Sequence, residues 1–322
     1  MNKIQLEVFK IMNETKISDW RDDLLSKQGK IITLLARDLL SVESDNRLPA
    51  MQDYAGRYGA SVGTVQAAFA YLSEIGAVSL DTQGKLGTFA RQLAYSRLWQ
   101  LAFQRAVVGA LPLPYARRLA GLATGVRAGL AADGVDYAPR FVRGSMTRLA
   151  LLGSGACDFA VVSRYVAESA AVYGFAVDSV LHFGVDSYTV DHVLLLRDGR
   201  NLVDGMRIGI DSNSADHAVV VRQVSRGVNL AFIEIDYSAG LDLLASGAID
   251  ATVWTRDDLP PSFGFQVVPL DSDIDVAKLG EAVLVVQAGA RPIAHLINDA
   301  LNVERVGELQ GEVVRRERLP SY

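Results

Sequence analysis

The chain contains one segment twice, and this duplication constrains its fold more than any other feature. Residues 151–164 read LLGSGACDFAVVSR and residues 243–256 read LLASGAIDATVWTR, and the two align without a gap. Each copy has the pattern of a helix end, a glycine suited to a left-handed C-cap, a turn with an aspartate, and a buried strand. Because a sequence segment that recurs within one chain indicates a repeated structural unit, we interpret the copies as corresponding parts of two similar lobes.

An apolar, strand-like run precedes each copy, at residues 137–143 and 229–235. Strand–helix–strand therefore occurs twice, and such units build parallel sheets that are covered by helices. A last apolar strand, 282–287, follows the second copy, and we expect it to return to the first lobe. Lobe I is predicted at 104–197 and 282–322, and lobe II at 200–281. Two crossings between the lobes would form a hinge.

Composition excludes several classes of protein. The 322 residues carry a net charge of −5 and are 50% hydrophobic, so the chain has ample core but no overall basic field for nucleic acid. The single cysteine, Cys157, excludes an internal disulfide and a cysteine zinc site, and we interpret it as a core residue. No apolar run is long enough to be a signal peptide or to span a membrane, so a cytoplasmic protein is expected.

The first 94 residues are predicted to form a separate domain. Helices are expected over residues 1–28, 30–40 and 51–58, and from Ser61, a good N-cap, to about Ile75. Two short strands, 78–80 and 87–90, flank a glycine-containing turn and predict a hairpin. Helices followed by a small hairpin are typical of a winged helix-turn-helix. Residues 95–103 are predicted as an ordered connector to the body of the chain, 104–322.

Residues 48–90 resemble the GntR-type winged helix in the spacing of their motifs. Matching positions include Leu48-Pro49, Tyr58-Gly59, Thr64-Val65 and the Gly87-Thr88-Phe89 end of the wing. In that family the second helix of the motif enters the major groove and the wing reaches the neighbouring minor groove. The resemblance therefore implies DNA binding through Gln52, Arg57, Ser61, Val62, Thr64, Gln66, Lys85 and Thr88.

The predicted recognition helix lacks the basic residues usual in that family, because residues 61–75 contain no lysine or arginine. Phosphate neutralisation supplies most non-specific affinity, so we expect weak binding by one head and a homodimer on a palindromic operator. Gln66 can still pair with adenine, and Val62 can contact a thymine methyl. Arg57, Lys85 and Arg91 are the candidates for backbone contact. The alternative is a head that has kept its core and lost DNA binding.

Three further stretches carry a second resemblance: GALPLPYARRLAGLATG (109–125), RIGIDSNSADH (207–217) and GAIDATVWTRDD (247–258). Residues from about 100 to 322 resemble the type II periplasmic-binding-protein fold, and the whole chain resembles the YhfZ family, which joins a GntR-like head to such a domain. The expected fold is therefore α/β, with a winged helix-turn-helix before a two-lobed domain. In such folds the ligand sits between the lobes, where strand carboxyl ends and helix amino termini converge.

This geometry selects candidate ligand-binding residues from strand ends, helix starts and an aromatic wall. Free amides and the dipole at a helix start favour an anion, so a small carboxylate- or phosphate-bearing effector is the preferred ligand. Asp211 and Asp216 could instead receive an amine, which leaves a zwitterion open. The candidates are Pro114, Tyr115, Ser145, Met146, Thr147, Ser163, Arg164, Ser212, Asn213, Ser214, Tyr237, Trp254, Thr255 and Arg256.

Signs of catalysis are absent from the sequence. The four histidines are scattered without metal-ligand spacing, and there is no G-x-S-x-G elbow or Walker loop. We therefore expect no enzyme activity, metal or cofactor, although an enzyme with dispersed catalytic residues is an alternative. The sequence predicts a ligand-responsive transcription regulator, with DNA and a small-molecule effector as partners and no membrane association. Effector binding would close the lobes and act on the heads through residues 95–103.

Overall fold

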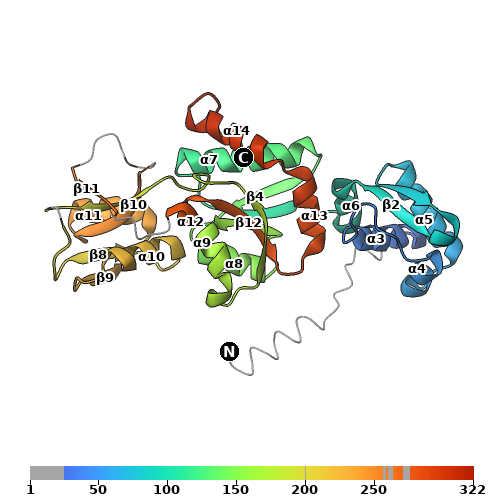
Figure 1. The fold of residues 1–322 in the computed structure, drawn as a ribbon, viewed down its shortest axis with the longest axis horizontal. Coiled ribbons are helices and arrows are strands. Elements are labelled where there is room, and N and C mark those ends of the chain that lie inside the picture. The colour runs from blue at the N-terminus through green and yellow to red at the C-terminus, as the bar shows by residue number, and fades with distance from the viewer. Residues whose placement is uncertain (1–24, 200, 257–258, 260–263, 271–275) are drawn as a thin grey trace, which may run out of the picture. The chain divides into compact units, whose positions relative to one another are not determined.

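The computed structural model describes residues 25–199, 201–256, 259, 264–270 and 276–322. The chain divides into two compact units, a head that ends at Gln104 and a body that begins at Arg105 (Figure 1). Most of the helix expected over residues 1–28 lies outside the described residues. None of the helices in the described ranges is long and apolar enough to cross a membrane.

The head has the order of elements that the sequence predicts. Helices α3 (Lys27–Leu39), α4 (Met51–Tyr58) and α5 (Val62–Glu74) precede an antiparallel hairpin of β1 (Val78–Thr82) and β2 (Thr88–Leu93). Between α4 and α5 the chain turns at Gly59, which caps α4 in the left-handed region at φ 62°. Ser61 then caps α5, because its Oγ accepts from the Thr64 amide at 3.1 Å. Leu35, Tyr54, Val65, Phe69 and Leu72 form the buried centre of the head.

The connector expected at residues 95–103 is a helix of the head. This helix, α6 (Tyr95–Phe103), packs on α3. Leu98, Trp99 and Ala102 are buried, and Arg37 of α3 donates to the Ala102 carbonyl at 2.9 Å. The apolar face of α6 therefore binds it to the head, so the ordered segment predicted at 95–103 is a helix that packs as part of the head. Residues 104–106 alone separate α6 from the first strand of the body.

The first sheet of the body has the strand order β4-β3-β5-β12-β6. Its parallel strands are β3 (Val107–Leu111), β4 (Tyr137–Phe141) and β5 (Phe159–Ser163), and they alternate with α7 (Arg117–Ala132) and α8 (Ser145–Gly153). Strand β6 (Val177–His182) follows α9 (Arg164–Ser169). Strand β12 (Ala282–Gln287) is followed by α13 (Arg291–Ala300) and α14 (Val303–Val314). Helices α7 and α14 lie on one side of this sheet, and α8 and α9 on the other (Figure 1).

The second sheet has the order β11-β7-β10-β8-β9. Its parallel strands are β8 (Arg207–Ile210), β9 (Ala231–Glu234) and β10 (Ala251–Thr255), and they alternate with α10 (Ala215–Val224) and α11 (Gly240–Ser246). Strands β7 (His192–Leu196) and β11 (Gln266–Pro269) complete it, and α12 (Val276–Gly280) leads back to β12. The repeated segments end in β5 and β10, the middle strands of two separate sheets. The duplication predicted from the sequence is therefore a duplication of lobes.

Each sheet also contains an antiparallel strand that lies outside its repeated strand–helix units. In lobe I, β12 pairs antiparallel with β5, and in lobe II, β7 pairs antiparallel with β10. We predicted the return of β12, whereas β7 was expected in lobe I and lies in lobe II. Its residues Leu194 and Leu196 face the α10 side of the sheet and Val193 and Leu195 the α11 side. Because β7 pairs with β10 and β11 of the second sheet, the first crossing lies at residues 183–191 and precedes the Arg197-Asp198-Gly199 turn.

The aspartate of each repeat joins two strands of its own sheet. Asp158 accepts from the Val108 amide of β3 at 2.8 Å and from the Arg105 guanidinium. Asp250 accepts from the Arg207 amide of β8 at 2.9 Å and from the Arg207 guanidinium. Since the same contact recurs in both lobes, the repeated aspartate fixes the middle strand against the first strand of each unit.

We expect replacement of Asp250 by asparagine to lower the free energy of unfolding by about 2 kcal/mol at pH 7. The hydrogen bond from Arg207 is the main reason why the pKa of Asp250 falls from 3.8 to about 2. A depressed pKa in the folded state stabilises the protein above pH 4, and this stabilisation is lost as the pH falls towards 2. Urea unfolding at pH 7 and pH 3 should therefore show a smaller gap between variant and parent at the lower pH.

The exposed neighbour Asp198, whose side chain is 81% accessible, provides the matched control. Asp198→Asn should leave the urea midpoint almost unchanged at both pH values. Equal effects of the two substitutions would contradict a clamping role for Asp250.

Candidate ligand-binding cleft and DNA-binding head

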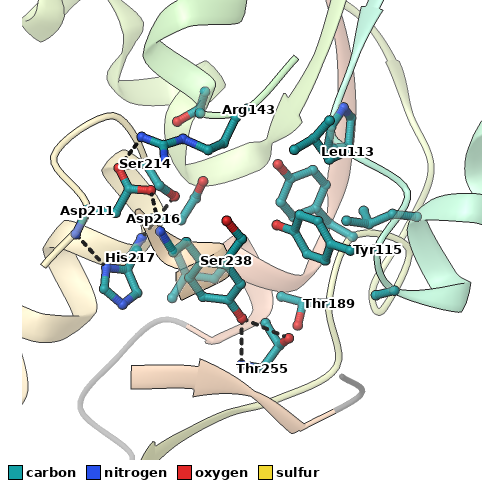
Figure 2. A pocket seen from close by; sticks show the side chains of 18 of the residues that line it. Leu113, Tyr115, Arg143, Thr189, Asp211, Ser214, Asp216, His217, Ser238 and Thr255 are labelled. Carbon is teal, nitrogen blue, oxygen red and sulfur yellow. Dashed lines mark hydrogen bonds and ion pairs between the residues drawn. The ribbon is translucent and has the colours of Figure 1, made fainter. Parts of the chain in front are cut away.

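A cleft of about 70 Å³ lies between the lobes and is lined by side chains of both (Figure 2). One buried water needs roughly 10–15 Å³ by a comparable measure, so the space suits a small molecule. Lobe I and the first crossing contribute Pro112, Leu113, Tyr115, Ala116, Leu119, Arg143, Gly144, Ser145, Arg148, Tyr188 and Thr189. Lobe II and the second crossing contribute His192, Asp211, Ser214, Asp216, His217, Tyr237, Ser238, Thr255 and Leu279.

The starts of α8 and α10 contact one another across the cleft. The Met146 amide donates to the Asn213 carbonyl at 3.2 Å, and the Ala215 amide donates to Ser145 Oγ, also at 3.2 Å. Ser163 Oγ, at the end of β5, donates to Asp216 Oδ1. These bonds hold the lobes together, and they engage the Met146 amide, which belongs to a helix start predicted to bind an anion.

Both arginines that line the cleft have protein acceptors. Arg143 follows β4 and forms ion pairs with Asp236 and, at 3.7 Å, with Asp211, which joins lobe I to lobe II. Arg148 is 2% exposed and donates to the Val161 carbonyl at 2.9 Å, to the Val142 carbonyl at 2.8 Å and to the Tyr188 hydroxyl at 2.8 Å. Its guanidinium is therefore enclosed by the walls of lobe I.

Two buried carboxyl groups from lobe II face the cleft in different environments. Asp211 accepts from the Asn213 and Tyr237 amides, each at 3.0 Å, in addition to its ion pair with Arg143. Asp216 is 7% exposed, and burial raises its pKa to about 6, against the effects of the Ser163 hydrogen bond and the Arg148 charge. Asp211 is thus the well-stabilised carboxylate, and Asp216 is the one that burial destabilises.

His217 is held neutral between the strands of lobe II. Its Nδ1 accepts from the Asp211 amide at 3.0 Å, so Nε2 carries the proton and donates to the Val253 carbonyl at 3.1 Å. Burial lowers the pKa of His217 to about 4. The imidazole therefore fixes the loop that carries Asp211 and supplies no charge to the cleft at neutral pH.

Aromatic rings form one wall of the cleft. The Tyr237 ring stacks on Trp254 with centroids 4.2 Å apart, and Tyr115 of lobe I faces it at 5.8 Å. The Tyr237 hydroxyl accepts from the Thr255 amide at 3.0 Å, which fixes the ring at the end of β10. Thr189 lies on the same side (Figure 2) and is 7% exposed, and its Oγ1 has no hydrogen-bond partner among the described residues.

The structure brings together five of the fourteen predicted ligand-binding residues at the cleft: Tyr115, Ser145, Ser214, Tyr237 and Thr255. Nine do not line it: Pro114, Met146, Thr147, Ser163, Arg164, Ser212, Asn213, Trp254 and Arg256. Most of these nine have another partner, which corrects their assignment to the lining. Arg164 pairs with Glu168 and Glu281, Arg256 pairs with Asp191, and Ser212 donates to Glu234. Trp254 lies behind Tyr237, and Ser163 caps α9.

Arg143 is the most informative residue that the sequence analysis missed. It stands two residues after β4, and Asp236 stands two residues after the corresponding strand β9. Opposite charges at equivalent positions of the two repeats were the signal that could have paired them. Tyr188, Thr189 and His192 were missed because the first crossing was placed too late in the sequence.

The residues predicted to bind DNA lie on α4, α5 and the hairpin of the head. Gln52, Gln66 and Lys85 are exposed, whereas Val62, Thr64 and Thr88 are partly buried. Ser61 and Thr64 hydrogen-bond to each other, with their hydroxyl oxygens 2.8 Å apart. Arg57 pairs with Asp38, and Arg91 pairs with Asp45 and Asp81 at 2.7 and 2.6 Å. Two of the three candidate phosphate contacts are therefore engaged with carboxylates of the head itself.

The described residues contain no group of three or more His, Cys, Asp or Glu side chains that could hold a metal ion. Cys157 is buried, and burial raises the pKa of its thiol to about 11. It packs in the lobe I core with Leu149, Leu152 and Val162, as predicted for a core residue.

Comparison with known proteins covers both units of the chain. The YhfZ C-terminal domain family matches residues 94–322, and a helix-turn-helix domain family matches residues 44–90. Protein YhfZ of Escherichia coli (strain K12) is 30% identical over 305 residues, which cover 94% of this chain and 100% of that protein. The crystal structure of YhfZ from Shigella flexneri matches with a TM-score of 0.60 and 29% identity over 71% of this chain and 98% of its own.

A more distant match extends the comparison of the fold. The substrate-binding protein of an amino acid ABC transporter from Streptococcus pneumoniae has a TM-score of 0.50 at 13% identity, over 70% of this chain and 97% of its own. The predicted combination of a helix-turn-helix head with a periplasmic-binding-protein-like α/β body is thereby confirmed.

Proposed function

Because the chain belongs to the YhfZ family, we propose that it is a DNA-binding transcription regulator that responds to a small polar molecule. The observation that carries this proposal is the cleft, which is lined by polar and aromatic side chains of both lobes in a chain that also has a helix-turn-helix head. A site shared between two lobes favours a ligand that reports its presence through lobe closure. Binding to DNA requires the cytoplasmic location that the sequence predicts.

The proposed mechanism is a population shift between open and closed lobes. Ser163, Ser145 and Arg143 of lobe I contact lobe II directly, so closure is stabilised by contacts that an open form would lose. An effector biases this equilibrium only by the difference in its affinity for the two forms. Residues 104–106 are the short path by which a change in lobe I reaches α6 of the head. Two heads of a homodimer would add their contacts on a palindromic site.

A thermal-shift screen of small metabolites on the full chain tests the sensing role. We expect at least one compound to raise the melting temperature, and a DNA selection with and without that compound to recover different amounts of one sequence. Absence of any stabilising compound, or a selection that recovers no sequence in either condition, would contradict the proposal.

The second candidate is a small-molecule-binding protein whose head no longer binds DNA. Its specific support is the engagement of Arg57 and Arg91 with Asp38, Asp45 and Asp81, together with the absence of basic residues from α5. Such a head offers few cations for phosphate neutralisation. Loss of all sequence-specific binding even at low salt, with ligand binding intact, would favour this candidate.

Replacing Gln66 by alanine separates these two candidates. Gln66 is exposed on α5, and its amide can make a bidentate contact with adenine. We expect Gln66→Ala to reduce discrimination at one base pair by about 1–3 kcal/mol and to leave the other positions of the site unchanged. Lys85→Ala is the control, because loss of a phosphate contact weakens binding to all sequences alike. An unchanged preference in a repeated DNA selection would remove Gln66 from the interface.

A further inference from the structure

The charged side chains of the cleft indicate which kind of ligand group can bind there. The guanidinium of Arg148 has three protein acceptors, and that of Arg143 pairs with two carboxylates of lobe II. An anion entering the cleft would have to displace Asp236 or Asp211 from Arg143. The arrangement therefore opposes the anionic effector that the helix starts suggested.

Asp216 is the cleft carboxyl group that forms no ion pair among the described residues, and the nearby charge of the enclosed Arg148 offsets its burial only in part. In the described ranges no lysine or arginine forms an ion pair with it, and the hydroxyl of Ser163 is its side-chain hydrogen-bond donor. A carboxylate that is 7% exposed is costly unless a charge or several hydrogen bonds compensate it. A protonated amine would supply a positive charge in direct contact with this carboxylate.

The rest of the lining suits the body of such a molecule. The rings of Tyr115 and Tyr237 approach from opposite lobes, and aromatic faces attract cations. The Thr189 hydroxyl is buried in the lining, in a residue 7% exposed, and has no hydrogen-bond partner among the described residues, so it can bond to a polar atom of a ligand.

We infer, on the basis of the regulatory function proposed above, that the effector carries a protonated amine which forms an ion pair with Asp216 in the cleft that Tyr115 and Tyr237 also line. A polar atom of the same molecule hydrogen-bonds to Thr189. The amine belongs to a free amine or to an α-amino acid, and both sources present the same charged group to Asp216.

Thermal shift followed by titration calorimetry on the full chain tests this inference with matched pairs of probes. One arm uses ethanolamine and putrescine, and the other uses the twenty standard L-amino acids. Each hit is compared with the analogue that has a hydroxyl group in place of the amine. A hydroxyl group cannot replace the cation of a buried ion pair, so the hydroxyl analogue should bind at least about 30-fold more weakly.

The substitution Asp216→Asn should lower the affinity for the amine by a similar factor. The control Asp242→Asn changes an exposed aspartate of the same lobe and should leave affinity unchanged. If Asp216→Asn does not fold, comparing the affinity of each amine with that of its hydroxyl analogue on the parent protein still tests the ion pair.

Equal binding of amine and hydroxyl analogue, or equal loss in both variants, would overturn the ion pair with Asp216. If carboxylates or phosphates without an amine raise the melting temperature and the amines do not, the inference that the effector carries an amine is overturned. The proposed sensing function would still stand. No stabilisation by any compound would overturn both.

Discussion

Replacing Arg148 by methionine is expected to lower the free energy of unfolding of the body by about 3 kcal/mol or more. Methionine keeps much of the length of the side chain and removes every donor. The carbonyls of Val142 and Val161 and the hydroxyl of Tyr188 would then lose their common partner inside lobe I. Each buried polar group left unsatisfied costs about 1–3 kcal/mol. Urea unfolding followed by tryptophan fluorescence measures the loss.

Arg140→Met is the matched control for this prediction. Arg140 lies on β4 in the same lobe, is exposed, and donates to one carbonyl, that of Ala156. Its replacement should change the free energy of unfolding by less than about 1 kcal/mol. If the two variants unfold at the same urea concentration, Arg148 does not organise lobe I.

The position of Arg148 links this loss of stability to ligand binding. The segments that it joins continue into Arg143, Ser163 and Thr189, which are the lobe I side of the cleft and of its closing contacts. A variant that still folds should therefore also bind the effector more weakly. The buried arginine fixes the geometry of three segments that are far apart in the sequence.

The lobes could be predicted because their information is local. The glycine, the aspartate and the apolar strand of each repeat lie within 14 residues of one another in the sequence. The contacts of Asp158 and Asp250 show why the aspartate recurs, since each fixes the middle strand of its sheet. A periodic local pattern of this kind predicts strands and helices without knowledge of the partner strand.

The place of β7 could not be predicted in the same way. Its apolar run, residues 192–196, would be buried equally well in either sheet. Its sheet is decided by antiparallel pairing with β10 and β11, which follow it by more than fifty residues. The hydrophobic pattern records burial on both faces and does not record which sheet provides it.

The cleft was predicted in outline, and most of its lining was not. The predicted helix starts lie where the lobes contact each other: Ser145 accepts through its hydroxyl from the Ala215 amide, and the Met146 amide donates to the Asn213 carbonyl. Whether such amides face a ligand or the other lobe depends on how closely the lobes approach, which no local motif encodes. Closure engages these amides with the opposite lobe and leaves the aromatic rings and the carboxyl groups to line the remaining space.

The second large effect is expected at Asp216, where asparagine should stabilise the ligand-free body at pH 7 by at most about 3 kcal/mol, because any amide N–H left without an acceptor reduces the gain. Burial raises the pKa of this carboxyl from 3.8 to about 6, so ionising it costs more in the folded chain than in the unfolded chain. Asparagine has no charge and retains an oxygen that can accept from Ser163. The gain should appear as a higher urea midpoint for Asp216→Asn than for the parent.

The pH dependence gives this prediction its sign. A carboxyl whose folded pKa is raised destabilises the protein fully above pH 6, and the cost fades as the pH falls from 6 towards 4. The advantage of Asp216→Asn should therefore be largest at pH 7 and small at pH 4. Acid also protonates His217, whose pKa burial lowers to about 4, but this effect is common to both proteins and cancels in their difference.

Asp242→Asn, on the surface of lobe II, should show no such pH-dependent gain. A parent that is as stable as Asp216→Asn at pH 7 would mean that Asp216 already has its charge compensated in the free protein. A more stable Asp216→Asn would mean that the charge of Asp216 is not fully compensated in the free protein. A carboxylate that costs the free protein stability at neutral pH can return that energy when a cation binds, because the ion pair then compensates the buried charge. The same substitution should thus strengthen the fold and weaken the response to an amine.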